Sequence, residues 1–251
     1  MNAPKGDQIM RTSLLIFGLI FAFGPAGTAH AVKPAPAPPS GPTEIAACQD
    51  ITQTGPYLLV NNLTVTDGDC LRVSADNVEI DLAGFGISMT GDPSAHRAGI
   101  RNVDSGAGFA NGLSVRNGAI SGFSSGIRID GGAGHRIEGV RISENTVDGI
   151  GITGAFDETG TGVANVIKNN VVVRNGTAAN GVGGIIVRCP AIVAGNLAVE
   201  NGPTTATAEQ IIVDGCQSDT IGFPDRSFFC TLVDNQPAIS VASLPNCTLL
   251  P

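Results

Sequence analysis

One short pattern recurs along most of this chain and limits what the chain can fold into. The segment Gly126–Ile150 reads GIRIDGGAGHRIEGVRISENTVDGI and contains two apolar-alternating runs and the start of a third. In the first run Ile127 and Ile129 alternate with charged residues, a period of two that is typical of a β-strand. Related runs open at Leu71, Ile100, Ile150, Ile185 and Ile211. The chain therefore repeats a strand-forming unit.

Each unit contains three such runs, which are separated by turns rich in Gly, Asn and Asp. Successive openings are 23 to 35 residues apart, so loops of variable length are inserted into a constant unit. Three short strands per unit are typical of one coil of a parallel β-helix, in which each strand stacks about 4.8 Å from its counterpart. We therefore predict an all-β, single-domain parallel β-helix of about six three-strand coils, capped at both ends. Asn145, Asn175 and Asn201 fall at the same turn and predict a stacked amide ladder.

The stretch Ala75–Phe85, ADNVEIDLAGF, resembles the first-coil signature of bacterial proteins of the pectate-lyase-like superfamily, within its carbohydrate-binding and sugar-hydrolase repeat group. The Gly-Ile openings are similar to the repeats of that group. The resemblance covers residues 48–215 and implies a right-handed β-helix, also called the pectin lyase fold. It also implies a carbohydrate ligand, but it is specific for the fold and not for an activity.

We expect residues 1–31 to be a secretory signal peptide. Its apolar segment Leu14–Phe23 is too short to span a bilayer comfortably, and Ala29-His30-Ala31 is a cleavage motif, with cleavage before Val32. Translation from Met1 or from Met10 and an uncleaved membrane anchor are the alternatives. The protein is then secreted or periplasmic, with no membrane contact after cleavage. Residues 32–43 form a Pro-rich linker. Residues 44–251 form the β-helix domain, including caps at 44–69 and 220–251.

Six cysteines remain after the signal peptide, an even number in an exported chain. This favours disulfide bonds over a metal cage. Six cysteines allow 15 sets of pairs, so the connectivity is a hypothesis. The pairs we expect are Cys48–Cys70, Cys189–Cys216 and Cys230–Cys247.

The net charge of −8 argues against general nucleic-acid binding, which requires a basic surface. A local basic stripe is nevertheless predicted. Arg72, Arg101 and Arg128 hold the same position in three successive coils, and Asp130 and Arg188 lie one step further out. Guanidinium groups bind carboxylate and sulfate groups well. The alternative is a solvated face on which Asp81, Asp104 or Asp130 pairs with the arginines.

The aromatic content bears on the kind of glycan. The chain has no Trp and a single Tyr, whereas neutral sugars often stack on aromatic faces. The main hypothesis is therefore that a secreted β-helix protein binds an acidic polysaccharide on its first-strand face. A structural or surface-interaction protein without catalysis is an alternative, and the oligomeric state is open.

A second alternative is a polysaccharide lyase-like enzyme, in which Arg101 or Arg128 would act as the base. The R-x-P-x-x-R pattern of pectate lyases begins at Arg188 but has Val193 in place of the second arginine. Glycoside hydrolysis requires paired carboxylates, and no convincing adjacent pair is found. Whether the protein is an enzyme stays open, and no catalytic residue is assigned.

No cofactor or metal is expected. His96 and His135 are isolated, which makes a weak case for zinc. Asp67–Asp69 and the pair Asp157-Glu158 could contact Ca²⁺, but such clusters are more often acidic turns, and no EF-hand spacing is present.

Overall fold

The computed structural model describes residues 41–93, 96–153, 163–177, 183–202, 210–214, 230–233, 235 and 247–250. The described part is all-β. Its strands are β1 (Thr43–Ile45), β2 (Gln49–Ile51), β3 (Gly55–Leu59), β4 (Leu63–Val65), β5 (Leu71–Val73), β6 (Val78–Asp81), β7 (Gly86–Met89), β8 (Ala98–Asn102), β9 (Ser114–Ser121), β10 (Ser125–Ile129), β11 (Arg136–Ser143), β12 (Asp148–Ile152), β13 (Asn165–Lys168), β14 (Val171–Val173), β15 (Gly183–Arg188), β16 (Ala191–Ala194), β17 (Leu197–Val199), β18 (Ile211–Asp214), β19 (Cys230–Val233) and β20 (Cys247–Leu250).

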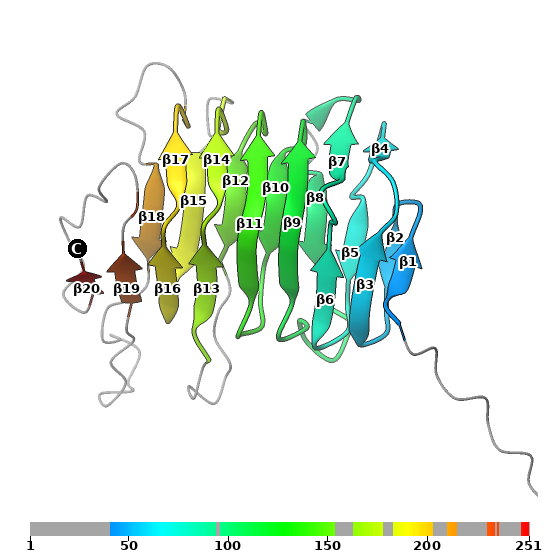
Figure 1. Cartoon of the computed structure of the whole chain (residues 1–251), viewed down its shortest axis with the longest axis horizontal. Helices are drawn as coiled ribbons and strands as arrows, with labels where there is room; N and C mark the ends of the chain where they lie inside the picture. Colours follow the sequence, from blue (N-terminus) through cyan, green and yellow to red (C-terminus); the bar gives the residue numbers. More distant parts are fainter. Residues whose placement is uncertain are drawn as a thin grey trace, which may run out of the picture. The chain divides into compact units, whose positions relative to one another are not determined.

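The strands stack in two parallel sheets (Figure 1). One has seven strands in the order β18-β15-β12-β10-β8-β5-β2, and the other has 13. Neighbouring strands in each sheet come from successive coils, so the chain advances by one strand spacing along the solenoid with each coil. This is a right-handed parallel β-helix, which confirms the predicted fold class.

The number of turns differs from the prediction. The N-terminal cap strands β2, β3 and β4 stack on β5, β6 and β7. The regular coils that follow open at β5, β8, β10, β12 and β15, and β9 and β11 each run through two strand positions without a break. The predicted sixth coil opens at Ile211 and provides β18 and β19, but among the described residues no third strand completes it. The solenoid therefore makes about five turns and not six.

Inward side chains form continuous apolar columns. Ile100, Ile127 and Ile150 lie in register on adjacent strands and are fully buried. Burial of each such side chain contributes about 1.5–3 kcal/mol. The glycine before each of these isoleucines packs closely against the core. A Cβ at Gly126, for example, would lie 2.5 Å from Cγ2 of Ile142. This contact explains why the repeat begins with Gly-Ile.

Two amide ladders run along buried turns. Nδ2 of Asn145 donates to Oδ1 of Asn175 at 2.8 Å, and Nδ2 of Asn175 donates to Oδ1 of Asn201 at 2.9 Å. The predicted ladder is confirmed. A second ladder, which the sequence analysis did not identify, joins Asn170 to Asn196 and Asn196 to Asn235, each at 3.0 Å.

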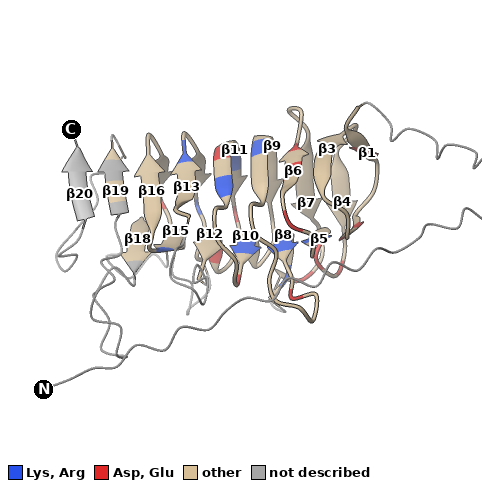
Figure 2. Ribbon diagram, turned by 90° about the horizontal axis from the view of Figure 1, so that it is seen from below, with Lys and Arg blue, Asp and Glu red and all other residues tan. Residues whose placement is uncertain are grey.

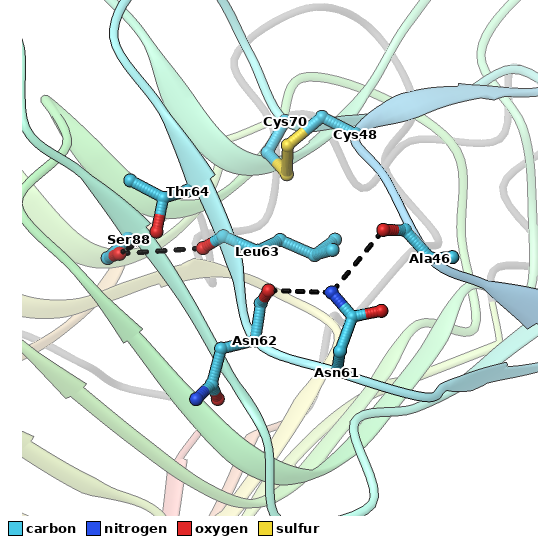
Figure 3. The surroundings of a disulfide bond; sticks show 8 residues. All are labelled: Ala46, Cys48, Asn61, Asn62, Leu63, Thr64, Cys70 and Ser88. Carbon is cyan, nitrogen blue, oxygen red and sulfur yellow. Dashed lines mark hydrogen bonds between the residues drawn. A yellow bond between two sulfur atoms is a disulfide. The ribbon is translucent and has the colours of Figure 1, made fainter.

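A disulfide joins Cys48 to Cys70 at the N-terminal end of the solenoid, as predicted (Figure 3). It lies beside Leu63, which is buried, and Nδ2 of Asn61 donates to the carbonyl of Ala46 nearby. The bond therefore ties β2 and the cap strands to the first regular coil. A disulfide is weakly compatible with an extracellular location.

The structure describes only some of the residues on which the other cysteine pairs and the N-terminal segments were predicted. Cys189 is disulfide-bonded, whereas Cys216 lies outside the described residues. The register pairs the Cα atoms of Cys230 and Cys247. The predicted signal peptide and most of the linker also lie outside the described residues. Within those that are described, no helix is long and apolar enough to cross a membrane.

Candidate functional site

Arg72, Arg101 and Arg128 stand directly opposite one another on β5, β8 and β10. These three residues are called the arginine column below. They point away from the core because the residues on both sides of each, such as Ile127 and Ile129, are buried. Figure 2 shows the basic residues of these three strands together on one face. The predicted alignment of the arginines is therefore confirmed.

Asp130 joins two members of the arginine column. Nη2 of Arg101 lies 3.3 Å from Oδ2 of Asp130, and Nε of Arg128 lies 2.8 and 3.1 Å from its two carboxylate oxygens. The hydroxyl of Thr153, from the next coil, lies 3.5 Å from Oδ1. One carboxylate thus neutralises two stacked guanidinium groups.

Asp69 and Asp50 continue this arrangement towards the N-terminal end. Asp69 lies 3.7 Å from Arg101 and 4.0 Å from Arg72, and it accepts the backbone N–H of Ala98 at 2.8 Å. Asp50, directly opposite Arg72 on β2, pairs with it at 3.3 Å. The result is a continuous ladder of alternating aspartates and arginines.

Two of the expected partners of the arginines are wrong. Asp81 lies on the other sheet and pairs with Arg116 at 3.1 Å. Asp104 accepts backbone N–H groups of its own loop, from Gly106 and Gly108. Neither Asp50 nor Asp69 could be predicted from the repeat pattern. Asp50 comes from the preceding coil, 22 residues before Arg72. Asp69 lies in the turn three residues before Arg72 and reaches Arg101 only because the next coil stacks beside it.

The arginines form the outer layer of this face. Side-chain exposure is 48 % for Arg72, 30 % for Arg101 and 32 % for Arg128, compared with 11 % for Asp69 and 20 % for Asp130. The hydrogen bonds of Arg128 use its Nε. Both terminal amino groups of that guanidinium have no hydrogen-bond partner among the residues that the structure describes.

The arginine column ends at Gly151, which lies opposite Arg128, and Ile186 follows in the next coil. Asp148, three residues before this glycine on β12, lies beside it. Its side chain is buried, and its Oδ1 has no hydrogen-bond partner. Burial raises the pKa of Asp148, while the charge of Arg128 and a hydrogen bond from Ser125 act in the opposite direction. The repeat pattern of the sequence did not predict Asp148 as a neighbour of the arginine column.

Arg188, the fifth predicted site residue, does not join the ladder. It stands in the same column as Asp130 and Thr153 but two coils from Asp130, and its Cα pairs with that of Asp214. Two strand spacings correspond to roughly 10 Å. Four of the five predicted site residues are thus brought together, and Arg188 is not.

On the outer face of the 13-stranded sheet, charged side chains also stack on neighbouring strands, but in a different order of charge. Asp81, Arg116, Glu138 and Lys168 are successive neighbours in one column there. Their charges alternate in sign from strand to strand. Like charges directly opposite one another destabilise a sheet, so alternation is the arrangement that favours stability. The arginine column departs from it.

Within the described ranges, the histidines and the acidic turn at Asp67–Asp69 show no metal-binding arrangement. His135 is fully buried, its Nδ1 accepts the N–H of Leu113 at 3.2 Å, and burial lowers its pKa to about 4. Asp67 pairs with Arg97 at 2.7 Å, and Asp157-Glu158 lies outside the described residues. In the part of the chain that the structure describes, no three His, Cys, Asp or Glu side chains are grouped to hold a metal ion.

The geometry of the arginine column suits an anionic ligand. Three guanidinium groups, one exposed and two partly exposed, follow one another at the strand spacing of about 4.8 Å. Each has a fork of N–H donors that matches a carboxylate or sulfate group. The aspartates beneath restrict their movement. Comparison of the chain with protein-family models, with curated proteins and with solved structures gave no match.

Proposed function

We propose that this protein is exported and binds an acidic polysaccharide through the arginine column. The observation that carries the proposal is the stacking of three like charges in register on β5, β8 and β10. Such stacking costs stability, and the other sheet of the same chain avoids it by alternating charges. A ligand that supplies negative charge along the column explains why the arginines are placed there.

The aspartates beneath the arginines favour this role. Each arginine in the column is held by at least one carboxylate that is less exposed or lies at the end of the ladder. Side chains that are already ordered lose less conformational entropy when a ligand binds. The carboxylates also cancel much of the long-range charge, so binding depends on direct, short-range contacts with the guanidinium groups.

The composition of the face favours an acidic over a neutral glycan. The single tyrosine, Tyr57, is buried, and the chain has no tryptophan. A sugar ring therefore has few aromatic faces on which to stack. The resemblance of Ala75–Phe85 to the pectate-lyase-like superfamily supports a carbohydrate as the ligand class and forms part of this proposal. The predicted signal peptide and the Cys48–Cys70 disulfide support export.

The test is retention of the purified protein on immobilised polygalacturonate as the salt concentration is raised. The double variant Arg101→Ala/Arg128→Ala is expected to lose at least about ten-fold in affinity, since each charge-assisted hydrogen bond contributes about 1.5–3 kcal/mol. The control is Arg116→Ala/Arg136→Ala, which removes the same charge from the other sheet. Equal retention of the two double variants would contradict the proposal.

A further inference from the structure

The alternating ladder on the first-strand face lacks one member. The three carboxylates of the ladder, those of Asp50, Asp69 and Asp130, each lie within ion-pair distance of at least one arginine of the column. At the next position the column has Gly151 where an arginine would continue it. The aspartate that would pair with that missing cation is present, because Asp148 lies directly beside the glycine.

The geometry shows that Asp148 faces this gap. Apart from its chain neighbours, the three heavy atoms nearest to a Cβ built on Gly151 would all belong to Asp148, with Oδ2 nearest at 3.3 Å. Asp148 as a residue is 8 % exposed, and its Oδ1 has no hydrogen-bond partner. Among the described residues, the one hydrogen bond of its side chain is long, 3.5 Å between the donating hydroxyl of Ser125 and Oδ2.

A buried carboxylate with one oxygen unpaired and only a long hydrogen bond to the other is costly, and proteins almost always pair such a group. The raised pKa of Asp148 agrees with this, since burial disfavours its charged form more than Arg128 and Ser125 stabilise it. A cation above Gly151 would supply the missing partner. It would also restore the alternation of charges that the ladder maintains over the preceding coils.

We propose that the gap above Gly151 binds an ammonium or guanidinium group carried by the same ligand whose anionic groups pair with the arginine column. This inference rests on the proposed function and narrows its ligand class. The ligand is then a zwitterionic polysaccharide, in which an acidic sugar is followed by a sugar with a free amino group. Asp148 is the residue that distinguishes it from a purely anionic polymer.

Hyaluronan oligosaccharides and their N-deacetylated forms provide a matched pair of probes. Both alternate an acidic sugar with an amino sugar, and only the deacetylated form has a free ammonium group. The wild-type protein is expected to bind the deacetylated form about ten-fold more tightly, the gain of one charge-assisted hydrogen bond. Asp148→Asn should abolish this difference and retain affinity for the acetylated form, whereas the control Asp81→Asn on the other sheet should keep the difference.

The outcomes separate the two proposals. If both forms bind wild type equally, the cation site is refuted and the anion-binding function stands. If neither form binds, both the anion-binding function for this class of polysaccharide and the zwitterionic ligand are refuted. A measurement of thermal stability then tests whether the gap above Gly151 favours a cation.

For that measurement Gly151→Arg places a guanidinium in the gap covalently. Gly151 has no positive φ, so a side chain is compatible with its backbone. The melting temperature of the Gly151→Arg variant should exceed that of Gly151→Met, whose new side chain has similar bulk and no charge, by about 2–4 °C. The difference should disappear in the Asp148→Asn background. Equal melting temperatures of the Arg and Met variants in the wild-type background would overturn the proposal.

Discussion

Arg128 and Asp130 lie two positions apart at the end of β10, and Nε of the arginine is 2.8 Å from one carboxylate oxygen of the aspartate and 3.1 Å from the other. Residues two apart on a strand point to the same side, so this pair forms within one coil. The same carboxylate also reaches Arg101 in the preceding coil at 3.3 Å. Asp130 therefore links contacts within a coil to contacts between coils.

Replacing Asp130 tests this double role. Asp130→Asn leaves Arg101 and Arg128 opposite one another without the charge between them, and we expect the free energy of unfolding to fall by about 1–2 kcal/mol. The matched control is Asp50→Asn at the exposed end of the ladder. A surface ion pair of that kind contributes at most about 1 kcal/mol. Urea denaturation of both variants is the measurement, and a smaller loss for Asp130→Asn than for Asp50→Asn would contradict the argument.

The buried amide ladder predicts a larger effect at Asn175. Its Oδ1 accepts from the backbone N–H and from Nδ2 of Asn145, and its Nδ2 donates to Asn201 and to the carbonyl of Ile142. Asn175→Ala leaves several buried groups unpaired, at about 1–3 kcal/mol each, so we expect a loss of about 3–5 kcal/mol in urea denaturation. The control Asn61→Ala, at an exposed bend between β3 and β4, should cost less than about 1 kcal/mol.

His135 should make stability depend on pH in the acidic range. Burial lowers its pKa from 6.5 to about 4, so its contribution is complete above pH 6.5 and is lost as the pH falls towards 4. The difference corresponds to about 3 kcal/mol. In His135→Asn this dependence should be absent, and Asn165 already occupies the equivalent position in the next coil. Thermal unfolding between pH 3.5 and 7.5 measures the effect, and parallel curves for the two proteins would refute it.

Asp148 should act with the opposite sign. Its pKa is raised in the folded protein, so the folded state is favoured at low pH and loses stability as the pH rises from the unfolded value through the folded pKa. Asp148→Asn imitates the protonated form and should therefore be more stable than wild type at pH 7 and similar to it at pH 3. A lower stability of the variant at pH 7 would show that the carboxylate has a stabilising partner.

The disulfide at the N-terminal cap should contribute to stability mainly by restricting the unfolded chain. Its cysteines are 22 residues apart, and a loop of this size corresponds to about 3 kcal/mol. Cys48→Ser/Cys70→Ser is expected to lower the free energy of unfolding by that amount while the far-ultraviolet spectrum stays that of a β-protein. Unchanged stability on adding a reducing agent to wild type would contradict this.

The arginine column could be predicted because a strand has a period of two. A shift of register by one residue would expose Ile127 and Ile129 and bury Arg128, so the apolar pattern determines which residues of successive coils face one another. The same reasoning found the ladder of Asn145, Asn175 and Asn201. It did not find the ladder through Asn170 and Asn196, although these residues also lie at equivalent turns of successive coils.

The sequence by itself determined the coil: alternating Ile and Val form its strands, Gly and Asn close its turns, and the apolar columns set its register. Only the tertiary structure decided which charges meet. Asp50 reaches the arginine column from the preceding coil and Asp69 from the turn before β5, because stacked strands stay about 4.8 Å apart while the loops between them vary in length. Separation along the chain therefore does not give distance in space, and the partner of each arginine is settled by how the coils stack.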